Sequence, residues 1–173
     1  MQNIDFKAEL RDPEAARAQC VLLGATMLGE LHQTDTYFKM PDGRLKKREA
    51  PGEPTEWIFY HRENNSRPRL SNFTILSDSQ ARNRWGTQSL RIWVVVKKIR
   101  ELWMHENVRI HLDRVVLLGW FIEFEALVSE QHDKLNCHRM MSMLRTHFGP
   151  VLGEPISTSY SDLIALEDGK QGA

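Results

Sequence analysis

The sequence predicts an α+β fold, a closed antiparallel β-barrel of about eight strands with helices packed on its outside. Three observations support this prediction. Short segments of alternating polar and apolar residues recur along most of the 173-residue chain, as is typical of β-strands. Turn residues separate many of these segments by a few positions only, and short connections favour antiparallel neighbours. The charged residues of several segments share one face, which favours a barrel with a polar interior.

The chain begins with a predicted strand followed by a helix. Residues 3–10 alternate strictly, with apolar residues at the even positions. Asp12 and Pro13 are typical of a helix N-terminus, because an Asp side chain can accept from the first free backbone N–H groups and proline fits the first turn. The helical spacing continues to Leu23, and Gly24 fits a C-terminal cap.

In the central part of the chain, the residue pattern predicts strands joined by turns and followed by a helix. The predicted strands cover residues 34–40, 44–48, 57–62 and 71–76. Proline, glycine and polar residues at 41–43, 51–54 and 63–68 supply the connections. Residues 78–90 predict a short helix.

In the last third of the chain, the residue pattern predicts a long hairpin, one further strand and a methionine-rich helix. Residues 92–104 and 108–113 form the arms of the hairpin, and residues 120–128 form the strand. The helix covers residues 135–148 and ends at Gly149 and Pro150. Two or three helices are expected in all, and residues 1–173 form one domain because no linker interrupts the pattern.

The composition excludes several functional classes. Hydrophobic residues make up 41% of the chain and charged residues 27%, which suits a folded core rather than a disordered chain. The 23 basic and 23 acidic side chains cancel, whereas binding to nucleic-acid phosphates normally requires a basic excess. We therefore expect no nucleic-acid partner.

Cysteine usage and hydropathy predict a cytoplasmic protein with no membrane partner. Cys20 and Cys137 lie far apart and outside any CxxC motif, so neither a disulfide scaffold nor a structural zinc site is expected. The first residues lack the basic and apolar regions of a signal peptide. No window approaches the roughly 18 consecutive apolar residues of a membrane span.

Charged residues on the same face of each predicted strand are the most informative pattern. For any single strand a solvent-facing polar side explains the alternation best, because half-exposed antiparallel sheets are common. However, Arg44, Lys46 and Arg48 would then repel one another without compensation. Polar faces turned inward explain all strands together. The grouped residues are Asp5, Lys7 and Glu9; Arg44, Lys46 and Arg48; Tyr60 and Arg62; Lys98 and Arg100; Arg109, His111 and Asp113; Glu123 and Glu125.

Basic groups confined in such an interior require an anion with several charges, and a polyphosphate would suit them. Carboxylates at Asp5, Glu123 and Glu125 could hold a hard divalent cation through oxygen ligands. Such a cation would bridge phosphate oxygens and offset their charge. For His111, a structural hydrogen-bonded role is favoured over a proton shuttle. Met140, Met141 and Met143 are expected to fill the core.

A series of motifs appears in a specific order and spacing. They are Asn3–Ala8, Gln33–Phe38, Gly43–Glu49, Tyr60 with Arg62, Pro68–Ser71, Val96–Arg100, Asn107–Asp113, Gly119–Glu125 and Ser159–Leu163. Together they resemble the CYTH, or triphosphate tunnel, superfamily, which includes class IV adenylyl cyclases and thiamine triphosphatases. The resemblance spans residues 3 to about 163 and is strongest to the bacterial class IV adenylyl cyclase-like branch.

The resemblance implies a set of site residues. Asp5, Glu123 and Glu125 would bind Mg²⁺ or Mn²⁺, and Asp113 would orient basic groups or join the metal ligands. The implied catalytic residues are Asp5, Lys7, Glu123 and Glu125. The implied triphosphate-binding residues are Lys7, Arg44, Lys46, Arg48, Arg62, Arg69, Lys98, Arg100 and Arg109. Three positions depart from the family pattern: Asn3 and Asp5 replace glutamates, and Arg69 replaces a lysine.

The function implied by the resemblance is a metal-dependent enzyme acting on a small-molecule triphosphate. In the cyclase reaction the ribose 3′-hydroxyl of ATP attacks the α-phosphorus, giving cyclic AMP and pyrophosphate. Two alternatives remain open. One is hydrolysis of thiamine triphosphate or inorganic triphosphate, and the other is non-catalytic binding of a triphosphate or nucleotide. A homodimer is compatible with the sequence.

Overall fold

The computed structural model describes residues 1–171, which form a closed antiparallel barrel of eight strands with a ninth strand outside it. The barrel strands follow the order β5-β4-β3-β2-β6-β7-β8-β1, and pairing of β5 with β1 closes the ring. Their bounds are β1 Gln2–Leu10, β2 Thr26–Phe38, β3 Arg44–Glu49, β4 Glu56–Arg62, β5 Arg69–Leu76, β6 Ile92–His105, β7 Val108–Val115 and β8 Gly119–Leu127. The predicted fold class is thus confirmed.

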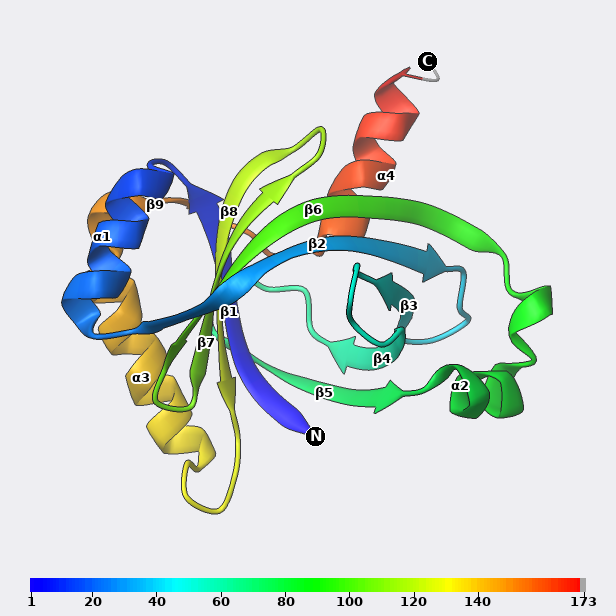
Figure 1. Ribbon diagram of the computed structural model, residues 1–173, viewed down its shortest axis with the longest axis horizontal. Helices are drawn as coiled ribbons and strands as arrows, with labels where there is room; N and C mark the ends of the chain where they lie inside the picture. Colours follow the sequence, from blue (N-terminus) through cyan, green and yellow to red (C-terminus); the bar gives the residue numbers. More distant parts are fainter. Residues whose placement is uncertain (172–173) are drawn as a thin grey trace.

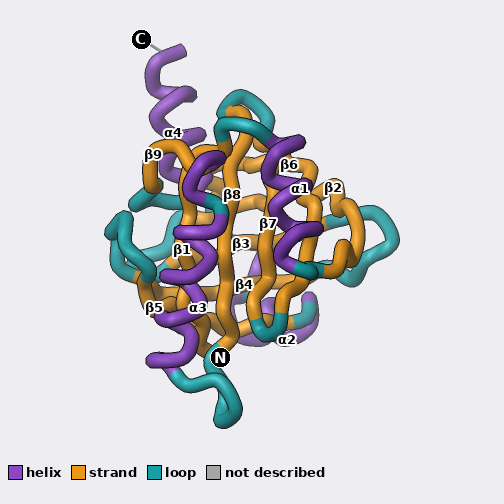
Figure 2. The backbone as a smooth tube through the Cα atoms, turned by 90° about the vertical axis from the view of Figure 1, so that its left-hand side faces the viewer, coloured by secondary structure: helices purple, strands orange, loops and turns teal. Residues whose placement is uncertain are grey.

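Helices α1 (Pro13–Leu23) and α3 (Lys134–His147) lie side by side over the outer face of β1, β8 and β7 (Figures 1 and 2). The sequence explains both boundaries of α1. The Asp12 side chain accepts from the Ala15 N–H at 3.0 Å, and Gly24 ends the helix with a φ of +79°, a conformation that glycine adopts without strain.

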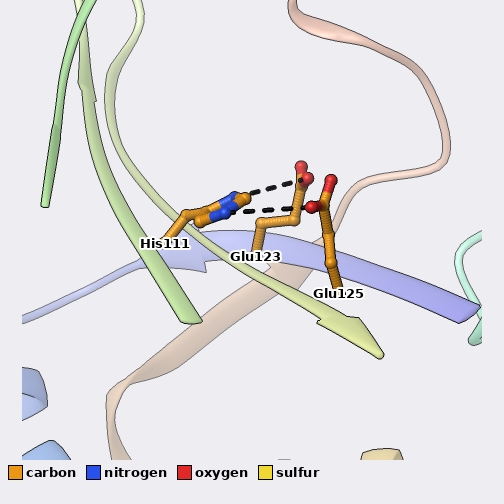
Figure 3. Close-up of side chains that lie close together, drawn as sticks. All are labelled: His111, Glu123 and Glu125. Atoms are coloured by element: carbon orange, nitrogen blue, oxygen red, sulfur yellow. Dashed lines mark ion pairs between the residues drawn. The ribbon is translucent and has the colours of Figure 1, made fainter. Parts of the chain in front are cut away.

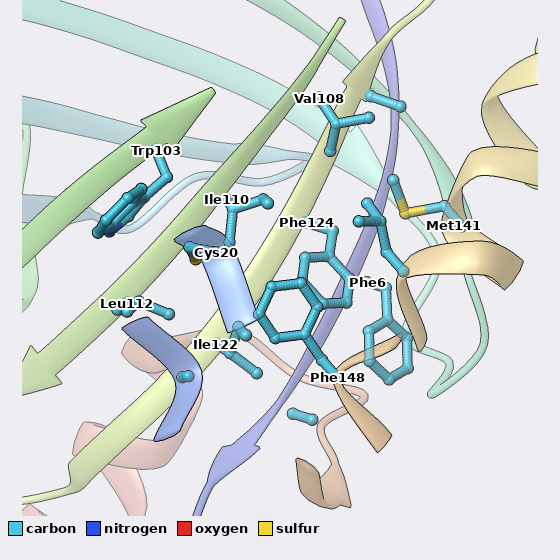
Figure 4. Packing of buried hydrophobic residues seen from close by; sticks show 14 of the residues in the cluster. Phe6, Cys20, Trp103, Val108, Ile110, Leu112, Ile122, Phe124, Met141 and Phe148 are labelled. Carbon is cyan, nitrogen blue, oxygen red and sulfur yellow. The ribbon is translucent and has the colours of Figure 1, made fainter. Parts of the chain in front are cut away.

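The largest hydrophobic core therefore lies outside the barrel, between these two helices and the three strands, and Trp103 of β6 joins it (Figure 4). Even-numbered residues of each strand enter it, including Phe6 of β1, Ile110 of β7 and Phe124 of β8. The helices contribute Cys20 and Met141. Odd-numbered residues of the same strands consequently face the barrel interior, as the charge pattern predicts.

Helix α2 (Asp78–Trp85) packs against the opposite part of the barrel, where Ala81 joins Leu45 and Trp57 in a smaller cluster. It begins with a capping box, since Ser77 accepts from the Gln80 N–H and the Gln80 side chain accepts from the Ser77 N–H. The predicted helix over 78–90 is too long: Gly86 ends it, and residues 87–89 form a separate 3₁₀ turn.

Two elements were not predicted. Strand β9 (Leu152–Pro155) pairs with the end of β1, and α4 (Tyr160–Gln171) projects from the barrel (Figure 1). The described residues thus contain four α-helices rather than two or three. The strand β2 also begins at Thr26, earlier than predicted, and Met143 is exposed rather than part of the core. Within residues 1–171, none of the helices is long and apolar enough to cross a membrane.

Candidate functional site

The barrel encloses a cavity of about 840 Å³ lined by charged, polar and apolar side chains. Seven of the predicted triphosphate-binding residues line it: Lys7, Lys46, Arg48, Arg62, Lys98, Arg100 and Arg109. Three predicted carboxylates, Asp5, Glu123 and Glu125, line it as well. The inward orientation of the charged faces is the feature that brings these residues together.

Strand register places the acidic residues beside basic ones in layers across the barrel wall. Glu123 of β8 lies between Lys7 of β1 and His111 of β7. One layer further along, Glu125 lies between Asp5 and Arg109. Directly paired residues have side chains on the same face, so each layer points into the cavity.

Glu123 and Glu125 form a compact group with His111, in which ligand atoms from the three residues lie within 4.8 Å of one another (Figure 3). Burial and the neighbouring Glu123 carboxylate raise the pKa of Glu125 to about 8. The pKa of Glu123 instead stays well below its ordinary value; burial opposes this, but the nearby Lys7 ammonium, 3.0 Å from Glu123 Oε2, and His111 outweigh it. Two adjacent carboxylates of this kind suit a divalent cation.

Asp5 is held by arginines at the edge of this group. Its Oδ1 accepts from Arg69 Nε at 3.0 Å and lies 3.6 Å from Arg62 Nη1. Burial is the main reason that the pKa of Asp5 is raised, with Arg62 opposing it and Glu123 adding to it. Arg69 also donates to the carbonyl oxygens of Asn65 and Ser157 and lies outside the cavity lining.

A second charged group surrounds Asp35, which is fully buried. Arg48 donates to both of its carboxylate oxygens at 2.8 and 2.7 Å, and Lys98 Nζ donates at 2.8 Å. Lys46 Nζ lies 3.4 Å away. Burial lowers the pKa of Lys98 to about 8, with Arg48 and Arg100 adding to the effect and Asp35 opposing it.

Arg100 forms the third interior ion pair, donating to both oxygens of Asp113 at 2.7 and 2.6 Å. The Tyr160 hydroxyl donates to the same carboxylate at 2.8 Å, and the Tyr160 ring lies 3.8 Å from Lys7 Nζ. Asp113 is thus bound to a basic side chain and a tyrosine, and it lies outside the cavity lining. Arg44 is also outside the lining, paired with Asp162 of α4 at 2.8 Å.

The two ends of the barrel interior differ. At one end the interior is filled by buried apolar residues of the strands, packed against Tyr160 and Ile164 of α4. These strand residues include Val94, Val115 and Phe121. The barrel is therefore blocked at the α4 end, because the tyrosine and the apolar cluster occupy the space that continues beyond Lys7 and Arg100.

The other end is lined by apolar residues that reach solvent, which we call the apolar mouth: Leu28, Leu31, Leu102, Met104 and Leu127. Strand pairing places them together, since the start of β2 runs beside the end of β6 and the end of β8 lies near the start of β7. Leu28 and Leu127 are about half exposed. The cavity thus has a charged inner part and an entrance where these apolar residues lie beside the polar residues Asn107, Ser129, Gln131 and His132.

Sequence reasoning missed Asp35, Tyr160 and the apolar interior end. Asp35 has the same strand parity as Gln33 and Tyr37, which also face inward, so the alternation of residues 33–37 was the signal available. Tyr160 lies within the Ser159–Leu163 motif, but its helix places it against Lys7 only through tertiary packing.

Comparison with known proteins identifies related folds. Residues 1–147 match the model of the CYTH domain family. No curated protein sequence shows significant similarity to the chain.

Three solved structures share the fold over most of their length. The PH1012 protein of Pyrococcus horikoshii OT3 is 21% identical, with a TM-score of 0.72 over 93% of this chain and 98% of the other. A candidate adenylate cyclase of Vibrio parahaemolyticus is 18% identical, with a TM-score of 0.74 over 94% and 97%. HpAC1 of Hippeastrum, a candidate adenylyl cyclase described as having a dominant triphosphatase activity, is 13% identical, with a TM-score of 0.62 over 91% and 92%.

Proposed function

The chain belongs to the CYTH domain family, and from its site we propose that it is an enzyme acting on an organic triphosphate with a divalent metal, most closely an ATP-cyclising enzyme. The observation that carries this proposal is the division of one cavity into a basic inner part and an apolar mouth. A triphosphate group matches the inner part, and an organic group matches the mouth.

The inner part suits a polyanion because its basic side chains outnumber its carboxylates. Arg48, Lys98 and Arg100 already occupy fixed positions, held by Asp35 and Asp113. Such preorganised cations can stabilise phosphate charge without rearranging during the reaction. The blocked α4 end limits how far the phosphate chain can extend, so its organic group would remain at the mouth.

Glu123, Glu125 and Asp5 would hold Mg²⁺ or Mn²⁺ beside these cations. The raised pKa of Glu125, caused by burial and Glu123, fits this role because a bound cation would remove the repulsion between the two carboxylates. The bound ion would supply charge neutralisation at the phosphate oxygens. Lys7, paired with Glu123 at 3.0 Å, is placed to contact both the carboxylate group and a phosphate.

In the cyclase reaction the ribose at the mouth would present its 3′-hydroxyl to the α-phosphorus, while the inner arginines and lysines bind the departing pyrophosphate. Positioning of the two groups accounts for much of the rate enhancement expected of such a site. A second candidate is hydrolysis of the terminal phosphate. The triphosphatase activity described for HpAC1 supports it, since HpAC1 shares this fold.

The test is a product assay with ATP, thiamine triphosphate and tripolyphosphate, each with Mg²⁺ and with Mn²⁺. Cyclic AMP and pyrophosphate from ATP are the expected products. Phosphate released from any of the three would move the chain to the triphosphatase alternative. Tight triphosphate binding without product would contradict an enzymatic role and leave the non-catalytic binder.

A further inference from the structure

His111 is buried like its neighbours Glu123 and Asp5, but one of its ring nitrogens lacks a hydrogen-bond partner. Its side chain is 3% exposed and points into the cavity beside Glu123 and Glu125 (Figure 3). Within residues 1–171, its Nδ1 finds no hydrogen-bond partner. The sequence favoured a structural, hydrogen-bonded histidine, and a buried structural histidine normally has its ring nitrogens satisfied. The unpartnered Nδ1 is therefore available for another role.

Both ring nitrogens face carboxylates at distances too long for hydrogen bonds. Nδ1 lies 3.6 Å from Glu123 Oε1, and Nε2 lies 3.8 Å from Glu125 Oε2. Only one ring nitrogen can bind a given ion. One ligand atom from each of His111, Glu123 and Glu125 lies within 4.8 Å of the other two, so small side-chain movements would place all three around one ion. Glu123 keeps its other oxygen, Oε2, on Lys7, so Oε1 remains available on the side of the imidazole.

The oxygen ligands on β1 are fewer than the family pattern would supply. Asn3 carries an uncharged amide, and Asp5 is occupied by Arg69 at 3.0 Å and Arg62 at 3.6 Å. A cation bound to Glu123 and Glu125 thus has few further oxygen donors on β1, and the buried nitrogen of His111 is next to both carboxylates.

We propose that His111 supplies an imidazole ligand to the metal ion held by Glu123 and Glu125, and that the site consequently prefers a transition-metal ion such as Mn²⁺ or Co²⁺ over Mg²⁺. The preference follows from ligand chemistry, because Mg²⁺ favours oxygen donors and imidazole favours first-row transition metals. This inference rests on the proposed function, which assigns the metal to Glu123, Glu125 and Asp5. Its new element is the nitrogen ligand.

The direct test uses pulsed electron paramagnetic resonance of Mn²⁺ bound to the wild-type protein in the absence of triphosphate. The expected result is a coupling to nitrogen that changes when histidine is labelled with ¹⁵N. Bound Mn²⁺ without this coupling would show an all-oxygen site, and absence of Mn²⁺ binding would show that the group is no metal site. Either result would overturn the proposal.

Calorimetry of variants identifies which histidine is involved. His111→Gln should weaken Co²⁺ binding at least tenfold and change Mg²⁺ binding less than threefold. His132→Gln is the matched control, because His132 lines the same cavity in the loop after β8, and it should leave both affinities unchanged. Equal losses of Co²⁺ and Mg²⁺ binding in His111→Gln would contradict the proposal, as would unchanged Co²⁺ binding.

Tripolyphosphate binding in EDTA separates this inference from the function on which it rests. Binding of tripolyphosphate without nitrogen coordination would overturn the His111 ligand and leave the proposed function standing. Absence of tripolyphosphate binding would instead contradict the proposed function, whatever the metal measurements show.

Discussion

Arg48 and Asp35 form a two-point ion pair inside the barrel, with Nε donating to Oδ1 at 2.8 Å and Nη2 donating to Oδ2 at 2.7 Å. The same carboxylate binds Lys98 and lies 3.4 Å from Lys46. Asp35 is thus the counter-charge for three basic side chains in the free protein. A bound triphosphate would supply negative charge in the same place.

Asp35→Asn should destabilise the free protein by about 3–5 kcal/mol, the usual cost of leaving buried charges unpaired. Tripolyphosphate should restore part of this loss, because it brings negative charge to the same three cations. Urea unfolding with and without tripolyphosphate measures both effects. Asp42→Asn, at an exposed carboxylate, is the control and should change little. An Asp35 variant as stable as the wild type would disprove the role of Asp35 as a buried counter-charge.

Tripolyphosphate affinity should fall as the pH rises above about 8. Lys98 has a pKa of about 8 in the free protein because of burial, so it is charged at pH 7 and neutral at pH 9. Since the anion binds the charged form, each pH unit above 8 should cost up to about tenfold in affinity for one linked proton. Calorimetry in EDTA across this pH range measures the tripolyphosphate affinity.

Glu125 also has a pKa of about 8, and its ionisation opposes anion binding in the same pH range. The pH series is therefore carried out in a Glu125→Gln background. In that background, Lys98→Arg should make the profile less steep, because arginine stays charged throughout. Burial also lowers the pKa values of Lys46 and Lys7, so these residues account for the slope that remains. An equally steep profile with arginine would show that another group is responsible.

Glu123→Gln should abolish turnover while leaving tripolyphosphate affinity in EDTA within a few-fold of the wild type. Glu123 is placed to hold the metal and Lys7, whereas Arg48, Lys98 and Arg100 bind through other carboxylates. Circular dichroism checks that the variant is folded. Glu56→Gln, also in the cavity lining, should retain activity. Full turnover in Glu123→Gln would show that Glu123 is not needed for catalysis.

Phe124→Ala should lower the free energy of unfolding by about 3–5 kcal/mol, as expected for truncating a large buried aromatic residue. Phe124 is fully buried between β8 and α3, on the outer side of the barrel wall. Because the cavity lies on the other side, the folded variant should bind tripolyphosphate with nearly wild-type affinity. Denaturant unfolding measures the loss of stability, and calorimetry measures the tripolyphosphate affinity. A large loss of affinity would contradict the separation of the outer core from the inner site.

Strand alternation was sufficient to predict the barrel and the inner face for most of the charged residues that line the cavity, although Arg44, Arg69 and Asp113 lie outside its lining. Lys98 and Arg100 share the inner face, and Ile110 and Phe124 share the outer one. This succeeded because side-chain orientation in a strand depends only on local geometry.

The ion pairs could not be predicted, since they depend on which strands are neighbours. Lys98 meets Asp35 across 63 residues of sequence, and Tyr160 reaches Asp113 only after α4 packs against the end of the barrel. The blocked end has the same origin: Val94 and Phe121 share strand parity with charged residues, and only the structure shows where along the barrel the polar lining stops.

The most direct test of the central claim, that the barrel interior is a triphosphate site, is calorimetric titration of the wild-type protein with tripolyphosphate and with orthophosphate. One tripolyphosphate should bind per chain with an affinity at least a hundredfold above that for orthophosphate, and Arg48→Gln should weaken this binding markedly. Equal weak binding of both anions, or tripolyphosphate binding unchanged by Arg48→Gln, would contradict this claim.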